Sequence, residues 1–281
     1  MRKTTAQHQE TIKKIAVKWQ LTDLEPITET SRAFVLKVTG PMGHAVLKYY
    51  KRWHRAGEGA ASHFMRSLKP GVGPIIYRDS LWHTSVLMEW LDGPTLNSLI
   101  REGQDVQAAE MFTDVARGIL DSKFLVPSMY NRKMPKLKKS LAELNAHPNP
   151  DQLRRVRDLG CHLAKTTTRE RILHGDLHGD NIIITPNGPR LIDPKGVRAD
   201  PALEFSKVLL RPIHDLATPD LIKRAQERAA IFAPTIDVEP LRLIQWAAMV
   251  LGHSTLRRTA KSPSEPLEEQ LVKALLDLSE R

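Results

Sequence analysis

The sequence predicts an α+β fold in two unequal parts, a small sheet-containing part in residues 1–90 and a larger, mainly helical part in residues 91–281. The first part contains short runs of β-branched and aromatic residues separated by turn signals, which is typical of antiparallel strands. The second part is dominated by segments with apolar residues three and four positions apart, the spacing of amphipathic helices. With 281 residues the chain can bury a sizeable core, as one large domain or as two lobes.

The first part is expected to begin with a helix over residues 7–20 and to contain a second helix, Gly57–Leu68. The sequence Gly40-Pro41-Met42-Gly43 supplies a turn between two of the predicted strands. The strands expected in this part are 24–28, 33–39, 44–50, 75–78 and 85–90.

The second part is expected to be helical over residues 95–126 and again from Asp151 to Lys165, with Asp151 as the residue that caps the latter helix. Three further helical patterns follow towards the C-terminus. They cover residues 219–233, 239–256 and 266–279.

The most informative stretch runs from Ile172 to Gly196. It contains His174-Gly175-Asp176, then Asn181, then two β-branched runs that flank a Pro-Asn-Gly turn, and finally Asp193. The two runs predict a β-hairpin, which would fix the distance between Asn181 and Asp193 at its outer ends. Phosphoryl transfer needs such a placement, because it uses a carboxylate that takes a hydroxyl proton and oxygen ligands that hold Mg²⁺ on the phosphates.

This stretch resembles the catalytic core of the protein kinase-like superfamily, and most closely its small-molecule branch, the aminoglycoside phosphotransferase and choline kinase family. That branch has His-Gly-Asp where protein kinases have His-Arg-Asp, and its loop usually reads HGDxHxxN, as residues 174–181 do here. Within the branch, the sequence Ile-Asp-Pro-Lys-Gly at 192–196 is similar to the streptomycin and hydroxyurea kinase subgroup.

The resemblance implies a bilobal kinase-like fold with ATP in the cleft between an N-terminal ATP-binding lobe and a C-terminal catalytic and acceptor-binding lobe. It implies Asp176 as the catalytic base and Asn181 and Asp193 as Mg²⁺ ligands, with His174 orienting the loop. Lys195 would add a positive charge near the transferred phosphoryl group, or would be a structural cation that pairs with an acid. We assign no chemistry to His178, because a histidine on a loop is more often structural.

The resemblance also implies a set of nucleotide contacts in the first lobe. Lys48, which ends the apolar run Ala-Val-Leu, would hold the α- and β-phosphates, with Glu58 as its partner unless Glu58 is a surface residue near a helix N-terminus. The turn with Thr30 and Ser31 would cover the phosphates through amides and hydroxyls, although a plain hairpin turn fits the same residues.

The segment around residues 85–93 resembles the hinge of the family. Met88 would lie near the adenine, whose edge would be bound by the backbone of Glu89 and Leu91. An ordinary edge strand that leads into a loop has the same pattern, so this alternative stays open.

Two rival classes of protein share the motif. Gly175 in place of Arg, and the lack of an Ala-Pro-Glu segment after Asp193, count against a protein kinase. The presence of Lys48, Asp176, Asn181 and Asp193 counts against a regulatory pseudokinase that only binds ATP. The sequence does not predict the oligomeric state.

The formal net charge is +10, and the excess of Lys and Arg lies in the first 200 residues. Such a charge suits anionic ligands such as ATP. It also suits nucleic acid, but aromatic residues make up only 5% of the chain, which disfavours a module that stacks bases. The basic stretch 131–139 contains Pro135, which predicts a loop rather than a regular helix. This loop is either solvated or a contact surface for an anionic acceptor, a lipid or nucleic acid.

The charge also bears on the hydroxyl acceptor. Streptomycin-like compounds carry several positive charges, and a protein that binds them needs acidic side chains. We therefore expect a neutral or anionic small-molecule acceptor. The alternative is a local acidic pocket, for which the candidates are Asp215, Asp220, Glu265, Glu268 and Glu269.

The remaining features indicate a cytoplasmic protein. No apolar run approaches the roughly 20 residues of a membrane span, and the N-terminus is polar. The single cysteine, Cys161, excludes an intrachain disulfide and is expected to be buried in a helix.

Overall fold

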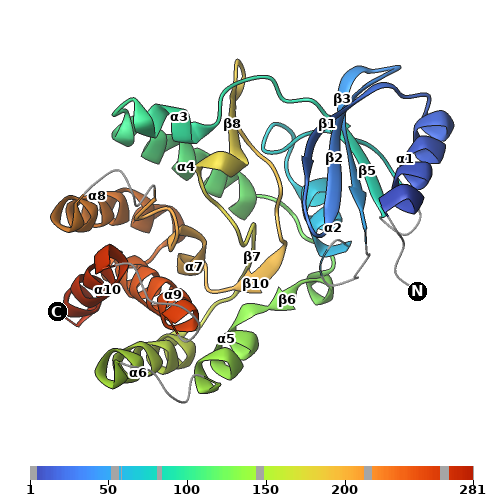
Figure 1. Ribbon diagram of the computed structural model, residues 1–281. Helices are drawn as coiled ribbons and strands as arrows, with labels where there is room; N and C mark the ends of the chain where they lie inside the picture. Colours follow the sequence, from blue (N-terminus) through green and yellow to red (C-terminus); the bar gives the residue numbers. More distant parts are fainter. Residues whose placement is uncertain are drawn as a thin grey trace.

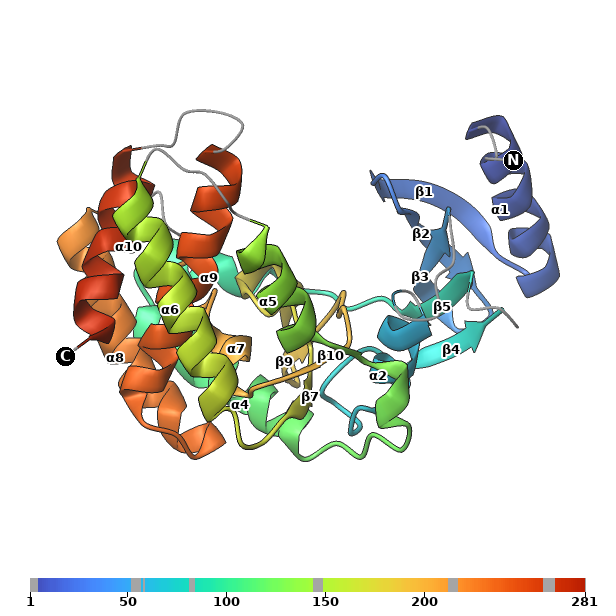
Figure 2. The same cartoon turned by 90° about the horizontal axis from the view of Figure 1, so that it is seen from below.

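A five-stranded antiparallel sheet on one side and a helical body on the other make up the fold in the computed structural model of the chain (Figure 1). The structure describes residues 5–51, 57, 59–80, 84–143, 149–211, 217–259 and 266–280. Figure 2 shows the sheet and the helical body side by side, with α2 on the side of the sheet that faces the body.

The sheet has the strand order β1-β2-β3-β5-β4, and all neighbouring strands are antiparallel. The Gly40↔Gly43 pair closes a two-residue turn between β2 and β3, which confirms the predicted turn. The strands are β1 (Thr22–Glu29), β2 (Ala33–Gly40), β3 (Gly43–Tyr50), β4 (Ile76–Asp79) and β5 (Ser85–Glu89).

The two faces of the sheet have different neighbours. Helix α1 (Thr5–Trp19) covers the outer face, where Trp19 packs in one buried cluster with Leu47 of β3. Because side chains alternate along a strand, Val46 and Lys48 point to the opposite face. That face lines the cavity between the sheet and the rest of the chain.

Helix α2 (Ala60–Ser67) joins the sheet to the helical body. Phe64 is fully buried, stacks on Phe124 with ring centroids 5.2 Å apart, and meets the ring of His174 edge-on at 6.0 Å. Its helix therefore belongs to the same hydrophobic core as the C-terminal helices. The predicted division of the chain between residues 90 and 91 stays a prediction.

The helical body confirms the predicted helices and refines their bounds. Residues 95–126 do not form one helix, because Gly103 adopts φ +81° and separates α3 from α4. The helices are α3 (Leu96–Arg101), α4 (Asp105–Leu120), α5 (Lys133–Ala142), α6 (Pro150–Thr166), α7 (Ala202–Phe205), α8 (Thr218–Ile236), α9 (Pro240–Thr259) and α10 (Pro266–Ser279).

The basic stretch 131–139 is not a loop, contrary to our prediction. Helix α5 begins at Lys133, and Pro135 is its third residue. Proline is tolerated there because the first four N–H groups of a helix have no intrahelical partner, so the missing N–H removes no hydrogen bond.

Two other expectations for α6 were wrong. The cap is Asn149, whose side-chain oxygen accepts a hydrogen bond from the N–H of Gln152 at 3.0 Å, while Asp151 pairs with Arg154 at 2.7 Å. Cys161 is exposed rather than buried, because it lies about 100° around the helix from the buried Gly160.

Short strands connect these helices around the central motif. Strand β10 (Val197–Ala199) lies between β6 (Asn131–Arg132) and β7 (Arg171–Leu173), and the predicted hairpin is present as β8 (Ile182–Thr185) and β9 (Gly188–Leu191). Among the described residues, no helix is both long and apolar enough to cross a membrane.

Candidate active site

A cavity of about 750 Å³ separates the inner face of the sheet from the hairpin β8–β9. Val46 and Met88, which are paired across β3 and β5, line it from the sheet. Ile183 and Ile192 line it from the hairpin side. Its size lies within the range of small-molecule pockets, which is about 300–1,000 Å³.

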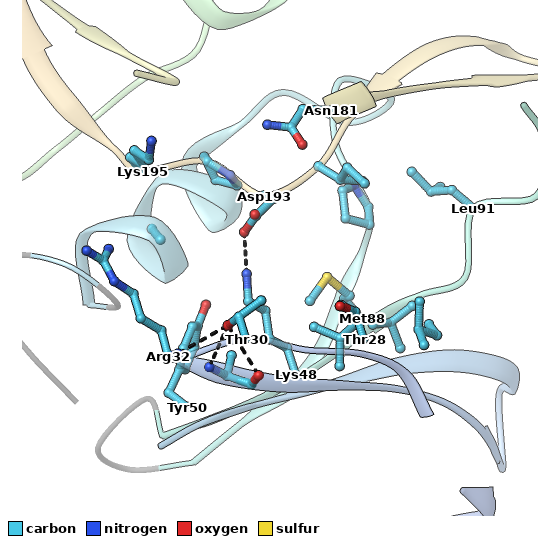
Figure 3. A pocket seen from close by; sticks show the side chains of 18 of the residues that line it. Thr28, Thr30, Arg32, Lys48, Tyr50, Met88, Leu91, Asn181, Asp193 and Lys195 are labelled. Atoms are coloured by element: carbon cyan, nitrogen blue, oxygen red, sulfur yellow. Dashed lines mark hydrogen bonds and ion pairs between the residues drawn. The ribbon is translucent and has the colours of Figure 1, made fainter. Parts of the chain in front are cut away.

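Lys48 and Asp193 form an ion pair across this cavity (Figure 3). Burial lowers the pKa of Lys48, but the interactions with Tyr50 and Asp193 outweigh it and leave this pKa above its ordinary value. Asp193 has φ +54°, a left-handed conformation that is uncommon for a residue other than glycine. Such strain concentrates at functional sites, where the surrounding structure maintains it.

The loop with His174-Gly175-Asp176 is built around a buried, neutral histidine. Burial lowers the pKa of His174 to about 4. Its Nε2–H donates to the carbonyl of Ile192 at 2.8 Å, and its Nδ1 lies 3.3 Å from the N–H of Asp176, which donates to it. His174 therefore ties the loop to the segment that precedes Asp193.

Gly175 has a physical reason to be glycine. Its φ is +78°, and a Cβ atom there would lie 2.7 Å from Cγ2 of Val197. An arginine, as in protein kinases, does not fit this backbone without a rearrangement.

Glu204 of α7 holds the same loop through hydrogen bonds to its backbone. Its carboxylate oxygens accept the N–H of Gly175 at 3.1 and 3.3 Å, and the side chain is buried. Burial raises the pKa of Glu204 to about 7, against the opposing effect of these backbone hydrogen bonds.

Asp176 is held between two ammonium groups. Lys195 lies 2.7 Å from one carboxylate oxygen, and Lys207 forms an ion pair with the other. Burial raises the pKa of Asp176, but the hydrogen bonds to both lysines outweigh this effect and hold the pKa well below its usual range. The carboxylate is therefore ionised at neutral pH.

Asn181 is oriented by its neighbours. Its Nδ2 donates to the carbonyl of Asp176 at 2.9 Å and to Nε2 of His178 at 3.2 Å. Because the amide nitrogen is committed to these acceptors, the amide oxygen is left for another ligand. His178, to which we assigned no chemistry, thus orients a residue of the site.

These residues suit Mg²⁺. Asn181 and Asp193 both line the cavity, and they offer an amide oxygen and a carboxylate, the oxygen ligands that Mg²⁺ prefers. Over the described ranges, no group of three or more His, Cys, Asp or Glu is arranged to hold a metal ion. The two residues therefore fit a site that phosphate oxygens and water complete.

The predicted nucleotide contacts line the same cavity, namely Thr30, Ser31, Lys48, Met88, Glu89 and Leu91. Thr30 has a local role that we did not foresee, because its hydroxyl accepts the N–H groups of Arg32 and Ala33 at 3.1 and 3.0 Å. Those two amides are thus engaged within the turn, whereas Ser31 has no such role. Glu58 lies outside the described residues.

The side chain of Glu89 joins the hinge to the hairpin. It accepts two hydrogen bonds from the guanidinium of Arg190, at 2.8 and 3.1 Å, and one from the N–H of Ile75 at 3.0 Å. Arg190 also donates to the carbonyl of Gly73. This bidentate pair fixes the strand before Asp193 against the strand that leads into Leu91.

Several residues of the site were not predicted from the sequence, namely Lys207, Arg190, Glu204 as the acceptor of the Gly175 N–H, and His178 as a partner of Asn181. Lys207 lies 31 residues after Asp176 in an apolar segment, and no motif marks it. The basic stretch gave a signal for two others, because Lys133 and Lys136 of α5 line the cavity.

The fold is that of the protein kinase-like superfamily. The chain belongs to the aminoglycoside/hydroxyurea antibiotic resistance kinase family, whose model matches residues 18–261. The family resemblance and the kinase-like fold predicted from the sequence are thereby confirmed, and the chain is placed among small-molecule phosphotransferases. A search of curated proteins finds no match.

Solved structures agree on the fold. Choline kinase LicA from Streptococcus pneumoniae has 14% identity and a TM-score of 0.64, over 97% of this chain and 99% of that one. A thermostable mutant of aminoglycoside phosphotransferase APH(4)-Ia, in its apo form, has 12% identity and a TM-score of 0.65, over 94% and 98%. Related structures of that phosphotransferase are ternary complexes with hygromycin B and ADP or AMP-PNP.

Proposed function

We propose that this protein transfers the γ-phosphate of MgATP to a hydroxyl group of a small molecule. The observation that carries the proposal is the placement of two carboxylates, Asp176 and Asp193. Asp176 and Asp193 lie at opposite ends of the motif, and each forms ion pairs with lysine. The hydrogen bond from His174 to the carbonyl of Ile192 links the two ends. Family membership supports the reaction class.

The nucleotide would lie between the sheet and the hairpin. Met88 and Ile183 provide apolar walls for the adenine, and the backbone of Glu89 and Leu91 would bind its edge. Lys48 would bind the α- and β-phosphates, after Asp193 exchanges its ion pair with Lys48 for a metal ligand role. Ser31 and its N–H remain for the phosphates at the turn.

Asn181 and Asp193 would hold Mg²⁺. A metal ion held by these two residues would supply positive charge that offsets the charge of the phosphates. His178 and Asp176 contribute by fixing the Asn181 amide, and Lys48 contributes a charge that can pair with either Asp193 or phosphate. Glu58 stays a proposed partner of Lys48 on sequence grounds alone.

Asp176 would orient the acceptor hydroxyl and accept its proton. The acceptor oxygen forms a bond to the γ-phosphorus, the bond from that phosphorus to the β–γ bridging oxygen breaks, and ADP leaves with the electron pair. The low pKa makes Asp176 a weak base. Proton transfer is therefore late, which suits a loose transition state that needs little nucleophile activation. Lys195 would neutralise charge on the transferred group.

Magnesium dependence tests the proposal. We expect ATP consumption, measured as ADP release across aminoglycosides, sugars, amino alcohols and nucleosides, to require a divalent metal. The Asp193→Ala variant should lose turnover and metal-dependent nucleotide binding, because it lacks the carboxylate that would hold the ion. Full activity in excess chelator would contradict the assignment.

A further inference from the structure

Helix α5 brings two lysines to the cavity that the proposed reaction does not use. Lys133 is half-buried and Lys136 is exposed, and both line the cavity with Lys195. Neither forms an ion pair within the part of the chain that the structure describes. Lys139, on the same helix, lies outside the cavity lining and approaches Glu143 at 3.9 Å, so its position differs.

Among the described residues, the lysines around Asp176 outnumber the acidic side chains that could pair with them. Lys195 and Lys207 already share the Asp176 carboxylate. Burial lowers the pKa of Lys133 most, the positive charges of Lys195, Lys207 and Lys136 lower it further, and the attraction of Asp176 is the smallest effect. Lys133, Lys195 and Lys207 therefore act on one carboxylate, and Lys136 adds a fourth ammonium group next to Lys133.

This cluster lies on the acceptor side of the site. Figure 3 shows Lys195 at the opposite end of the pocket from Met88 and Leu91, where the adenine is expected. Lys133 and Lys136 belong to the helical body, as Asp176 does, whereas Lys48 belongs to the sheet. The excess charge thus adjoins the carboxylate that would hold the acceptor hydroxyl.

Among the described residues, acidic side chains do not offset the cluster. Of the carboxylates that line the cavity, Glu89 is paired with Arg190 and Asp193 with Lys48, and Asp92 is exposed. The acidic pocket considered from the sequence is not seen in the described residues, because Asp220, Glu268 and Glu269 do not line the cavity. The other two candidates, Asp215 and Glu265, lie outside the described residues.

We propose that the acceptor carries an anionic group, a phosphate or a carboxylate, which binds Lys133 and Lys136 while its hydroxyl lies at Asp176. This inference rests on the proposed phosphotransferase function and names its substrate class. An anion there gains charge-assisted hydrogen bonds from two ammonium groups, and a polycation is repelled by the same groups. The subsite would thus select substrates by sign of charge.

The test compares acceptors that differ in charge. Glucose, gluconate and glucose 6-phosphate form one matched set, and ribose, ribonate and ribose 5-phosphate form another, with streptomycin as the cation. We expect wild-type kcat/KM to be higher for an anionic member than for its neutral parent and for streptomycin. The two anionic members distinguish a carboxylate subsite from a phosphate subsite. A clear preference for streptomycin or for the neutral parents overturns the inference.

Variants of Lys133 and Lys136 test whether these two lysines cause the preference for anionic acceptors. In Lys133→Gln, Lys136→Gln and the double variant, we expect kcat/KM for the preferred anion to fall by about tenfold or more per lysine, as the loss of a hydrogen bond to a charged group implies. Lys138→Gln is the matched control, because Lys138 lies on the same helix and does not line the cavity. If the double variant does not fold, the Lys136→Gln variant tests the inference on its own, because Lys136 is exposed. Equal losses for neutral and anionic acceptors overturn the inference.

If no tested acceptor is phosphorylated, a binding measurement tests whether the anionic subsite exists. Titration of MgAMP-PNP comes first, and failure to bind it refutes the proposed function itself. Sulfate, a dianionic probe, is then titrated into protein saturated with MgAMP-PNP. We expect binding that weakens in the Lys136→Gln and double variants but not in Lys138→Gln. No sulfate binding, or equal binding by all variants, overturns the anionic subsite while leaving the nucleotide site intact.

Discussion

Replacement of Glu204 by Gln should change how the stability of the protein depends on pH. Burial raises the pKa of this carboxyl to about 7 from its ordinary value of 4.5. Between these values the folded state binds a proton that the unfolded state has lost, so stability falls as pH rises. At about 1.36 kcal/mol per pH unit, the difference corresponds to about 3 kcal/mol that is present below pH 4.5 and lost above pH 7.

Urea unfolding of the wild type and of Glu204→Gln from pH 4 to 8 measures this effect, because the contributions of other groups cancel in the difference. The glutamine keeps an acceptor for the N–H of Gly175 but does not titrate. The wild type should lose up to about 3 kcal/mol relative to the variant as pH rises. A difference that is flat with pH, or that rises, would refute the reasoning about burial.

Two further substitutions test the site. Asp176→Asn should lower kcat by roughly 10²–10⁴, because it removes the proton acceptor, while calorimetry should show little change in MgAMP-PNP affinity. Arg190→Met should destabilise the protein by about 3 kcal/mol in urea unfolding, since it leaves Glu89 unpaired with only 23% of its side chain exposed. The Arg190→Met/Glu89→Gln double variant should recover part of that loss, and an additive loss would show that the pair is not coupled.

Much of the site was predictable because its residues are close in sequence and their spacing has a physical meaning. A hairpin of known turn chemistry relates Asn181 to Asp193 across twelve positions, and alternation along a strand placed Lys48 on the inner face. The turn at Gly40–Gly43 was found for the same reason, since local backbone preferences determined it.

The residues that were missed act across long sequence distances. Lys207 and Arg190 reach partners 31 and 101 positions away, and neither lies in a local pattern that marks its partner. Pro135 was expected to break a helix, as proline does in a helix interior. It lies in the first turn of α5 instead, where its missing N–H removes no hydrogen bond. Cys161 was placed in the core from its residue type, although the packed stripe of α6 runs through Gly160 and Leu163.

The two lysines on Asp176 bear on how any acceptor binds. Each carboxylate oxygen is engaged by an ammonium group, so an acceptor hydroxyl that binds Asp176 as proposed would share an oxygen with Lys195 or Lys207, or displace that lysine. Lys195 and Lys207 have 47% and 33% of their side chains exposed, so a displaced ammonium group would stay partly solvated and could bind another anion. The γ-phosphate can supply that anion, and so can an acidic group on the acceptor. Under the proposed function, the same charges that keep Asp176 ionised would favour an acceptor that brings negative charge to the site.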